Sequence, residues 1–442
     1  MASTVLSRTQ ANGTSSRIFT ASIWFKRSPV TNVGNQPIWS SSSSTGDALD
    51  LILQGNGEIV FEDVNGNAPK FVTSRQLRDP SAFYNVVVAV DSTQATDTNR
   101  VKIYLNGVQE TSFSTATYPT QNMDFAISTS ADTMKFGSGG QYNTNYFDGL
   151  MSYVAFVDGT AYDASYFGEV DSASGIWKIN TSPSVTYGTN GCFLKMDTSS
   201  PGSDTSGNNN TFTASGTPTL AEDNASNNLA TLNPLYYSTT QSTLSNGNLT
   251  ATSSGANWNN FHSTIAPSTG KWYWEIKVVN VGSNTHPIGI VGADWSDINS
   301  TSPGDSFDNG ATGISYVQTG DKDVAGSRSS YGNSYTTNDI IGVAMDLTNS
   351  KLYFSKNGTF QNSGDPTSGA TGTGAISIVS GHSYLASFAH YNTMVDSINF
   401  GNGFFGVTAV ASSNADAAGH GLFEYAVPTG YFSLNTKNLN TY

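Results

Sequence analysis

Two stretches of the sequence, one in each half, present the same order of features. Residues 84–91 read YNVVVAVD, and after a loop residues 100–107 read RVKIYLNG. In the second half, residues 340–346 read IIGVAMD, and after a shorter loop residues 351–358 read KLYFSKNG. Asn-Gly accepts the positive φ angles of a tight hairpin turn. The echo therefore favours two copies of one β architecture over a single β-solenoid, although such simple elements can also match by chance.

Alternation of apolar and other residues extends this β pattern along the chain. The run of residues 19–26, FTASIWFK, puts every second residue from Phe19 to Phe25 on one face. We expect this face to pack on a core and the face that begins at Thr20 to point toward solvent. No long segment has the apolar spacing of an amphipathic helix. The fold class predicted is therefore all-β.

The composition describes a folded, weakly charged chain. Its 442 residues suit two or three domains. Only 12% of the residues are charged, against roughly 25% in an ordinary soluble protein. Ser, Thr, Asn and Gly fill the balance, and these residues suit turns and strand faces better than helices. Aromatic residues make up 12% of the chain, which argues against disorder because disordered segments are poor in them.

Several classes of partner are disfavoured by charge and hydropathy. The formal net charge of −14 repels phosphate, so we expect no nucleic-acid binding. No run of about 20 apolar residues occurs, so we expect no membrane insertion.

The sequence shows no sign of secretion. The start of the chain lacks the apolar core of a signal peptide. The single cysteine, Cys192, cannot form an intrachain disulfide.

A change in composition near the middle of the chain predicts a domain boundary. Residues 198–228 contain few apolar residues and many Ser, Thr, Gly and Asn, as a loop or linker does. The following stretch, residues 228–235, is more apolar and is expected to pack on one of the domains. We therefore expect a first domain over residues 1–222, a linker over residues 223–238, and a second domain with a C-terminal tail over residues 239–442.

Each half resembles a known family of β-sandwiches. The first half, over residues 15–195, resembles laminin-G-like, concanavalin-type lectin domains through residues 19–27 (FTASIWFKR), 84–91, 100–107 and 147–162 (FDGLMSYVAFVDGTAY). The second half, over residues 240–405, is similar to SPRY domains through residues 270–278 (GKWYWEIKV), 287–293 (PIGIVGA), 313–316 (GISY) and 341–358 (IGVAMDLTNSKLYFSKNG). The resemblance implies two concanavalin A-like jelly-roll β-sandwiches in tandem.

The tandem arrangement and the tail over residues 431–442 (YFSLNTKNLNTY) resemble virion proteins of marine bacteriophages. This resemblance implies a non-catalytic structural protein located on a virion, of the tail-fibre or receptor-binding type. Its expected partners are other virion proteins and a glycan or protein of the host surface, and by analogy it forms a homo-oligomer. The alternatives are a capsid-decorating or tail-attached protein without a receptor role, and a depolymerase that acts on surface polysaccharide. The sequence leaves the ligand and the position on the particle open.

No catalytic or metal-binding set is expected. Retaining glycosidases need two carboxyl groups about 5–5.5 Å apart, whereas Glu58 and Glu62 on one strand lie about 13 Å apart at 3.3 Å per residue. We therefore interpret them as solvated carboxylates. The five histidines lack the spacing of a zinc motif and are expected to be isolated. They are His262, His286, His382, His390 and His420.

Aromatic residues beside Asn and Asp are the candidates for ligand binding, because sugars stack on aromatic rings and hydrogen-bond to amides. The candidates are Tyr142, Tyr146, Trp258, Trp295, Tyr331 and Tyr335. For each loop tyrosine, packing or simple exposure is the alternative. Trp272 and Trp274 share one face of a strand and are expected in the core. No cofactor is expected, except that residues 297–308 (DINSTSPGDSFD) offer oxygens for a structural calcium, with a solvated loop as the alternative.

Overall fold

The computed structural model describes residues 4–28, 34–43, 46–64, 69–140, 145–172, 175–196, 200–237, 240–293, 307 and 312–441. The chain divides into two compact units. The first unit contains Met1–Leu220 and Asn224–Ser226, and the second contains Ala221–Asp223 and Asn227–Tyr442. Strands dominate both units, and α1 (Thr436–Leu439) is the one α-helix in the described ranges. The predicted all-β class is confirmed.

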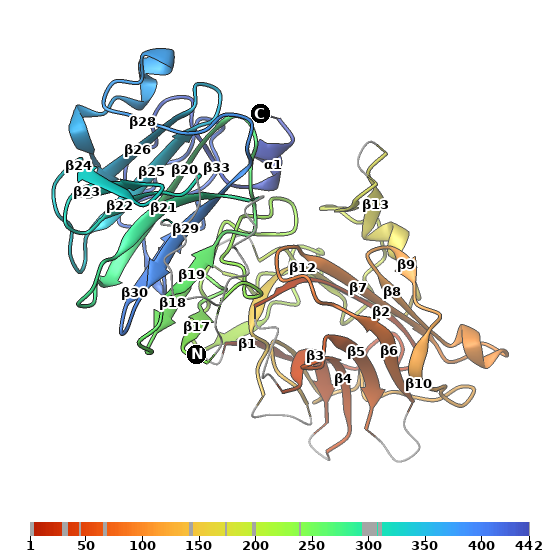
Figure 1. Ribbon diagram of the computed structural model, residues 1–442. Coiled ribbons are helices and arrows are strands. Elements are labelled where there is room, and N and C mark those ends of the chain that lie inside the picture. Colours follow the sequence, from red (N-terminus) through yellow and green to blue (C-terminus); the bar gives the residue numbers. More distant parts are fainter. Residues whose placement is uncertain are drawn as a thin grey trace. The chain divides into compact units, whose positions relative to one another are not determined.

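The first unit is a sandwich of two antiparallel sheets (Figure 1). One sheet runs in the order β10 (Phe113–Thr117), β6 (Lys70–Gln76), β5 (Glu58–Asp63), β4 (Ala48–Leu53), β3 (Gln36–Ser42), β11 (Thr133–Phe136), β1 (Val5–Thr9) and β16 (Thr213–Ser215). The other runs β15 (Cys192–Leu194), β12 (Gly149–Asp158), β2 (Ile18–Arg27), β7 (Tyr84–Asp91), β8 (Val101–Leu105) and β9 (Val108–Gln109). The short elements outside these sheets are η1 (Asp97–Asn99), η2 (Ala164–Tyr166), β13 (Gly168–Val170) and β14 (Trp177–Ile179).

Both faces of β2 are buried, which differs from the expected single core face. Phe19 lies in the sandwich core, with its ring centroid 6.4 Å from that of Trp39. On the opposite face, Trp24 is only 3% exposed. Residues that follow β12 cover this face, where the Thr20 hydroxyl donates to the carbonyl of Thr160 at 2.9 Å. The expectation that this face points to solvent is wrong because the connection after β12 adds a third layer.

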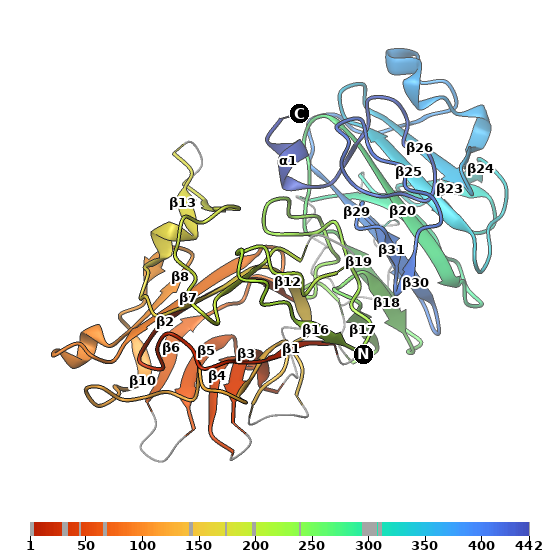
Figure 2. The same ribbon diagram turned by 180° about the vertical axis from the view of Figure 1, so that it is seen from behind.

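The second unit is also a sandwich (Figures 1 and 2). Its larger sheet runs β17 (Ser242–Ser245), β18 (Thr250–Ser253), β30 (Val395–Asn399), β20 (Lys271–Asn280), β25 (Ile340–Asp346), β26 (Lys351–Lys356) and β27 (Thr359–Phe360), with β28 (Ile376–Ser377) on β26 and β33 (Phe432–Ser433) on β20. The facing sheet runs β19 (Asn259–His262), β29 (Tyr384–His390), β21 (Pro287–Gly292), β22 (Ile314–Val317), β23 (Asp321–Val324) and β24 (Ser327–Ser330). The remaining elements are η4 (Gln361–Ser363), η5 (Pro366–Thr371), β31 (Phe404–Phe405) and β32 (Thr408–Ala409).

The ends of the second unit complete its core. Trp272 and Trp274 on β20 lie in the core between the sheets, as expected. Leu232, in the stretch expected as a linker, is fully buried in the same core. On the outer face of β20, Tyr273 packs on Phe423, with ring centroids 5.2 Å apart. The C-terminal tail then pairs with β20 through β33, so the linker stretch and the tail are both parts of this unit.

The echoed stretches are paired strands in both units. Residues 84–91 and 100–107 give β7 and β8, which pair antiparallel from Val86↔Leu105 to Val90↔Val101. Residues 340–346 and 351–358 give β25 and β26, which pair from Ile341↔Lys356 to Asp346↔Lys351. Asn106 and Asn357 both have positive φ, at 47° and 48°, as the Asn-Gly turns require. Within the described ranges, no helix is long and apolar enough to cross a membrane.

Candidate functional site

The structure separates the six aromatic residues proposed for ligand binding. Tyr142 and Trp295 lie outside the described residues. Tyr146 is 37% exposed and forms an isolated bridge with Ser138 in the first unit. Trp258 is partly exposed and lies just before β19. These two remain available to a ligand.

Tyr331 and Tyr335 are buried, which contradicts their selection as ligand-binding residues and agrees with the alternative that they pack in the protein. They are 6% and 3% exposed and belong to the core of the second unit. The Tyr331 hydroxyl accepts from the backbone N–H of Phe354 at 3.3 Å, and the Tyr335 hydroxyl donates to the carbonyl of His286. Buried tyrosines need such partners for the hydroxyl group. Gly and Asn neighbours in the sequence therefore do not show that a tyrosine ring is exposed.

Trp258 pairs with Tyr391, a residue that the sequence did not single out. The two ring centroids are 5.4 Å apart with a tilt of 54°. Trp258 also packs on the small apolar cluster of Val291, Phe307 and Ala389 on the outer face of the β19-containing sheet. Its partner lies in the turn between β29 and β30. The aromatic pair therefore joins two connections that are far apart in sequence.

Three connections meet at the same end of the second unit, and we call them the rim loops. They are residues 253–258, 280–286 and 391–394, where Ser253 is the last residue of β18 and Asn280 the last of β20. The pairings Thr252↔Val395, Asn259↔His390 and Asn280↔Val395 place their flanking strand ends together. Backbone hydrogen bonds join the first and third loops, because Asn392 donates to the carbonyl of Gly255 at 2.9 Å and Ser253 donates to that of Met394 at 3.0 Å. The rim loops are thus supported by one another.

The rim loops present uncharged polar groups beside the aromatic pair. Asn257, Ser283 and Thr393 are exposed. The side-chain amide of Asn280 donates to the carbonyl of Thr393, which fixes the second loop to the third. Aromatic faces flanked by amides and hydroxyls suit neutral polyhydroxylated ligands, because the ring supplies apolar contact and the polar groups supply directional hydrogen bonds. This end of the second unit is therefore a surface suited to such a ligand.

At the base of the rim loops lies a buried polar cluster of His286, the last residue of the second loop, with His390 and Asp396. Nε2 of His286 lies 2.6 Å from Oδ2 of Asp396, and Nε2 of His390 lies 2.9 Å from the same oxygen. All three side chains are fully buried. Nδ1 of His390 lies 3.2 Å from the Ser253 hydroxyl in the first rim loop. The expectation of isolated histidines is wrong for this pair, because residues 110 positions apart in sequence meet between the sheets.

The cluster keeps Asp396 ionised inside the protein. Burial raises the pKa of a carboxyl group, but the two imidazoles outweigh it and hold the pKa of Asp396 at about 2. Burial lowers the pKa of His390, which favours its neutral form. Asp396 is therefore a carboxylate at neutral pH, with two ring nitrogens aimed at one oxygen. Two histidines and a carboxylate are also a set that could hold a metal ion.

Other groups with reactive side chains have structural roles. Glu62 is buried and lies 2.7 Å from Nζ of Lys70, so it is an ion-paired carboxylate and not a solvated one. Burial raises the pKa of the Cys192 thiol, which leaves it in the unreactive protonated form. The proposed calcium loop over residues 297–308 lies outside the described residues, apart from Phe307.

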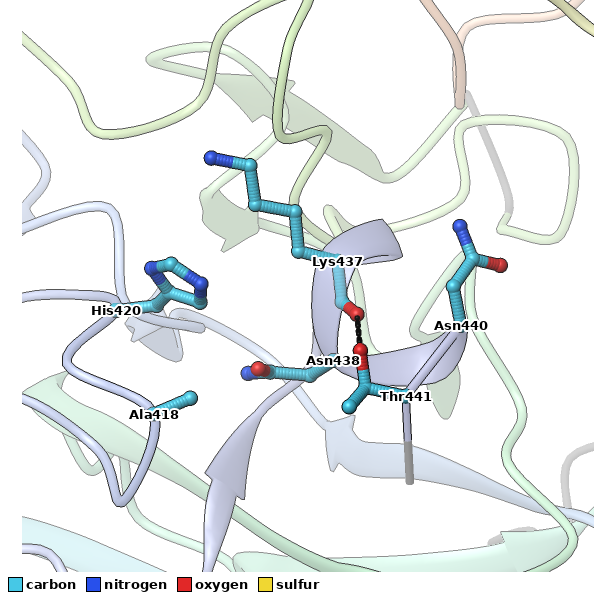
Figure 3. Close-up of a pocket in the computed structure, with 6 residues that line it drawn as sticks. All are labelled: Ala418, His420, Lys437, Asn438, Asn440 and Thr441. Atoms are coloured by element: carbon cyan, nitrogen blue, oxygen red, sulfur yellow. Dashed lines mark hydrogen bonds between the residues drawn. The ribbon is translucent and has the colours of Figure 1, made fainter. Parts of the chain in front are cut away.

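A shallow depression of about 500 Å³ lies beside the C-terminal helix (Figure 3). Figure 3 shows Lys437 and Asn438 of α1 on one side and His420 and Ala418 of a neighbouring turn on the other. The Thr441 hydroxyl donates to the carbonyl of Lys437 at 2.9 Å and closes the end of the helix. Among the described residues, its lining contains no Trp, Tyr or Phe to offer a stacking surface like that of the rim loops.

Comparison with known proteins identifies a domain type in each half. Residues 3–164 match the concanavalin A-like lectin/glucanases superfamily, in its laminin-G form. Residues 271–383 match the SPRY domain. The chain therefore carries a concanavalin A-like domain and a SPRY domain in tandem, and both resemblances seen in the sequence are confirmed at this level.

Individual relatives are distant or cover little of the chain. An ATP-dependent RNA helicase, DDX1, of Xenopus laevis is 31% identical over 103 residues, which are 23% of this chain and 12% of the helicase. The SPRY domain of human HERC1 is 13% identical, covering 38% of this chain and 96% of that structure, with a TM-score of 0.30. A SAP-like pentraxin from Limulus polyphemus is 14% identical, covering 36% of this chain and 70% of that structure, with a TM-score of 0.27.

Proposed function

We propose that this chain is a non-catalytic virion protein that recognises a glycan or protein of the host surface. The proposed binding surface is the set of rim loops around Trp258 and Tyr391. A rigid sandwich can carry varied loops without loss of its core, which is why binding residues so often lie on such connections. The observation that carries the proposal is the aromatic pair beside exposed uncharged polar groups, held by backbone hydrogen bonds between loops.

The placement on a bacteriophage particle rests on the tandem domains and on the C-terminal tail. The tail sequence resembles those of marine bacteriophage virion proteins, and here it pairs with β20 as part of the second unit. Tyr431 and Asn435 in the tail are fully buried. The tail is therefore required by the domain itself, and the proposal predicts that a chain truncated before it loses binding together with the fold.

Substitution of the aromatic pair should weaken binding to the host surface. We expect Tyr391→Ala to lower the affinity by about tenfold, since an aromatic contact is worth roughly 1.4 kcal/mol. Trp258→Phe should have a smaller effect, because a ring remains in place. The measurement is adsorption of the labelled full chain to a panel of bacterial cells and to polysaccharide extracted from them.

The matched control is Tyr166→Ala in the first unit. Tyr166 is 41% exposed and pairs with Tyr162 at a centroid distance of 4.4 Å, so it is also half of an aromatic pair. The Tyr166→Ala substitution should leave adsorption unchanged. If the wild-type chain adsorbs to none of the cells, yet its deletion weakens the particle, the protein is an architectural component. Release of reducing ends from the polysaccharide would instead identify a depolymerase.

A further inference from the structure

The cluster of His286, His390 and Asp396 connects the two sheets of the second unit. His390 ends β29 of the smaller sheet and His286 lies directly before β21 of the same sheet, whereas Asp396 lies on β30 of the larger sheet. One ligand atom of each side chain lies within 4.8 Å of the others. A single ion at their meeting point would therefore be bonded to both layers of the sandwich.

We propose that this cluster is a structural transition-metal site, with Zn²⁺ as its preferred ion. Two imidazole nitrogens and one carboxylate oxygen are a donor set that Zn²⁺ uses in proteins. The site would serve to tie the sheets together beneath the rim loops, which is a role separate from ligand recognition. Neither domain match assigns a metal to these residues.

The two separations from the carboxylate oxygen to the imidazole nitrogens require only a small expansion to accept the ion. Tetrahedral zinc with bonds of about 2.0–2.1 Å places its ligand atoms about 3.3 Å apart. The carboxylate oxygen now lies 2.6 Å from one imidazole nitrogen and 2.9 Å from the other. Small rotations of the three side chains, which move each ligand atom by a few tenths of an ångström, would open this space. The metal-free arrangement is then a hydrogen-bonded cluster that occupies the same positions.

The group behind His390 supports coordination, whereas Nδ1 of His286 contacts no hydrogen-bonding group among the described residues. In the metal-free form each Nε2 carries the proton that it donates to Asp396. On binding, the proton of each ring moves from Nε2 to Nδ1, and Nε2 gives its lone pair to the ion. His390 can then donate from Nδ1 to the Ser253 hydroxyl, 3.2 Å away, as metal-bound histidines commonly do to a neighbouring group.

A fourth ligand is also at hand. Oδ1 of Asp396 is buried and bonds to no group among the described residues. An unpaired buried carboxylate oxygen is costly, and coordination by both oxygens of the carboxylate would satisfy it. The second observation that points to an ion is therefore this unpartnered oxygen, in addition to the convergence of the three side chains.

The test measures metal bound to the full chain. We expect about one Zn²⁺ per chain in protein purified from zinc-supplemented cells, and again after removal by a chelator and slow reloading. Co²⁺ should replace it and show the absorption of a tetrahedral site. Asp396→Asn keeps an oxygen acceptor for both histidines, so the unit should still fold, yet bound metal should fall below about a tenth of an equivalent.

The controls are histidines outside the cluster. His382→Gln and His420→Gln should bind as much metal as the wild type. A wild-type chain that carries no metal either as purified or after reloading would overturn the proposal and leave a hydrogen-bonded cluster. Full binding by Asp396→Asn, or its loss in His420→Gln, would overturn it as well, because the metal would then lie elsewhere. Host-surface binding is a separate measurement, so either proposal can fail alone.

Discussion

Glu275→Ala is expected to lower the free energy of unfolding of the second unit by about 3 kcal/mol. Glu275 lies on β20 and is fully buried. Its carboxylate oxygens each accept a backbone N–H at 2.9 Å, one from Glu424 and one from Tyr425. The Tyr273 hydroxyl lies a further 3.1 Å from this carboxylate. Removal of the carboxylate leaves several buried donors without a partner, which is the costly half of a lost hydrogen bond.

We expect the substitution to loosen one segment of the second unit before the whole unit unfolds. The segment of residues 411–435 is held to β20 through this carboxylate, so its amides should exchange hydrogen faster in the variant. Hydrogen exchange read by mass spectrometry, together with urea unfolding, measures both effects. The stability of Glu275→Gln should lie between those of the wild type and Glu275→Ala. Its amide oxygen can accept one backbone N–H, while its NH₂ group faces the other. Exposed Glu169→Ala should change stability by less than about 0.5 kcal/mol, and an equal loss there would contradict the role given to Glu275.

The strands that carry the fold could be predicted because their signals are local. Residues 84–91 and 340–346 are apolar runs, and each is followed by a loop and a second strand that ends in an Asn-Gly turn. These local signals predicted the strands, which the structure then pairs. The burial of both faces of β2 was not predictable in the same way. It depends on residues after β12 that fold back over the sheet, and such a third layer has no signal in the strand itself.

The candidate site was predicted only in part, for a physical reason. Trp258 was recognised as a loop aromatic, but its partner Tyr391 is 133 residues further along the chain, and only folding brings their loops together. The same holds for the cluster of His286, His390 and Asp396. Tyr335 illustrates the opposite error, because its polar neighbours suggested a ligand-binding residue while its ring fills the core. Contacts across the two sheets are set by topology, and spacing in the sequence does not report them.

His262 gives the second unit a distinct response to acid. It is fully buried on β19, and its Nδ1 lies 3.0 Å from the Ser387 hydroxyl. Its Nε2 contacts no hydrogen-bonding group within the described ranges. Burial lowers the pKa of His262 from 6.5 to about 4, because the charged ring would lack water and a counter-charge. Below pH 6.5 the unfolded chain takes up a proton that the folded chain refuses, so this residue lowers stability as the pH falls.

The expected result is therefore a difference between wild type and His262→Gln that grows on acidification. From pH 7 to pH 5 the variant should gain about 2 kcal/mol relative to wild type, as follows from pKa values of about 4 folded and 6.5 unfolded.

Glu275 acts in the opposite direction, since burial raises its pKa to about 7 and its contribution is lost as the pH rises. Glu275 is present in both the wild type and His262→Gln, so its effect on stability cancels when the two are compared. Denaturant unfolding at several pH values supplies the measurement, with hydrogen exchange to assign the transition to the second unit. His420→Gln should follow the wild-type curve, because that ring is only partly buried. Parallel curves for wild type and His262→Gln between pH 7 and 5 would show that the buried imidazole accepts a proton in the folded state.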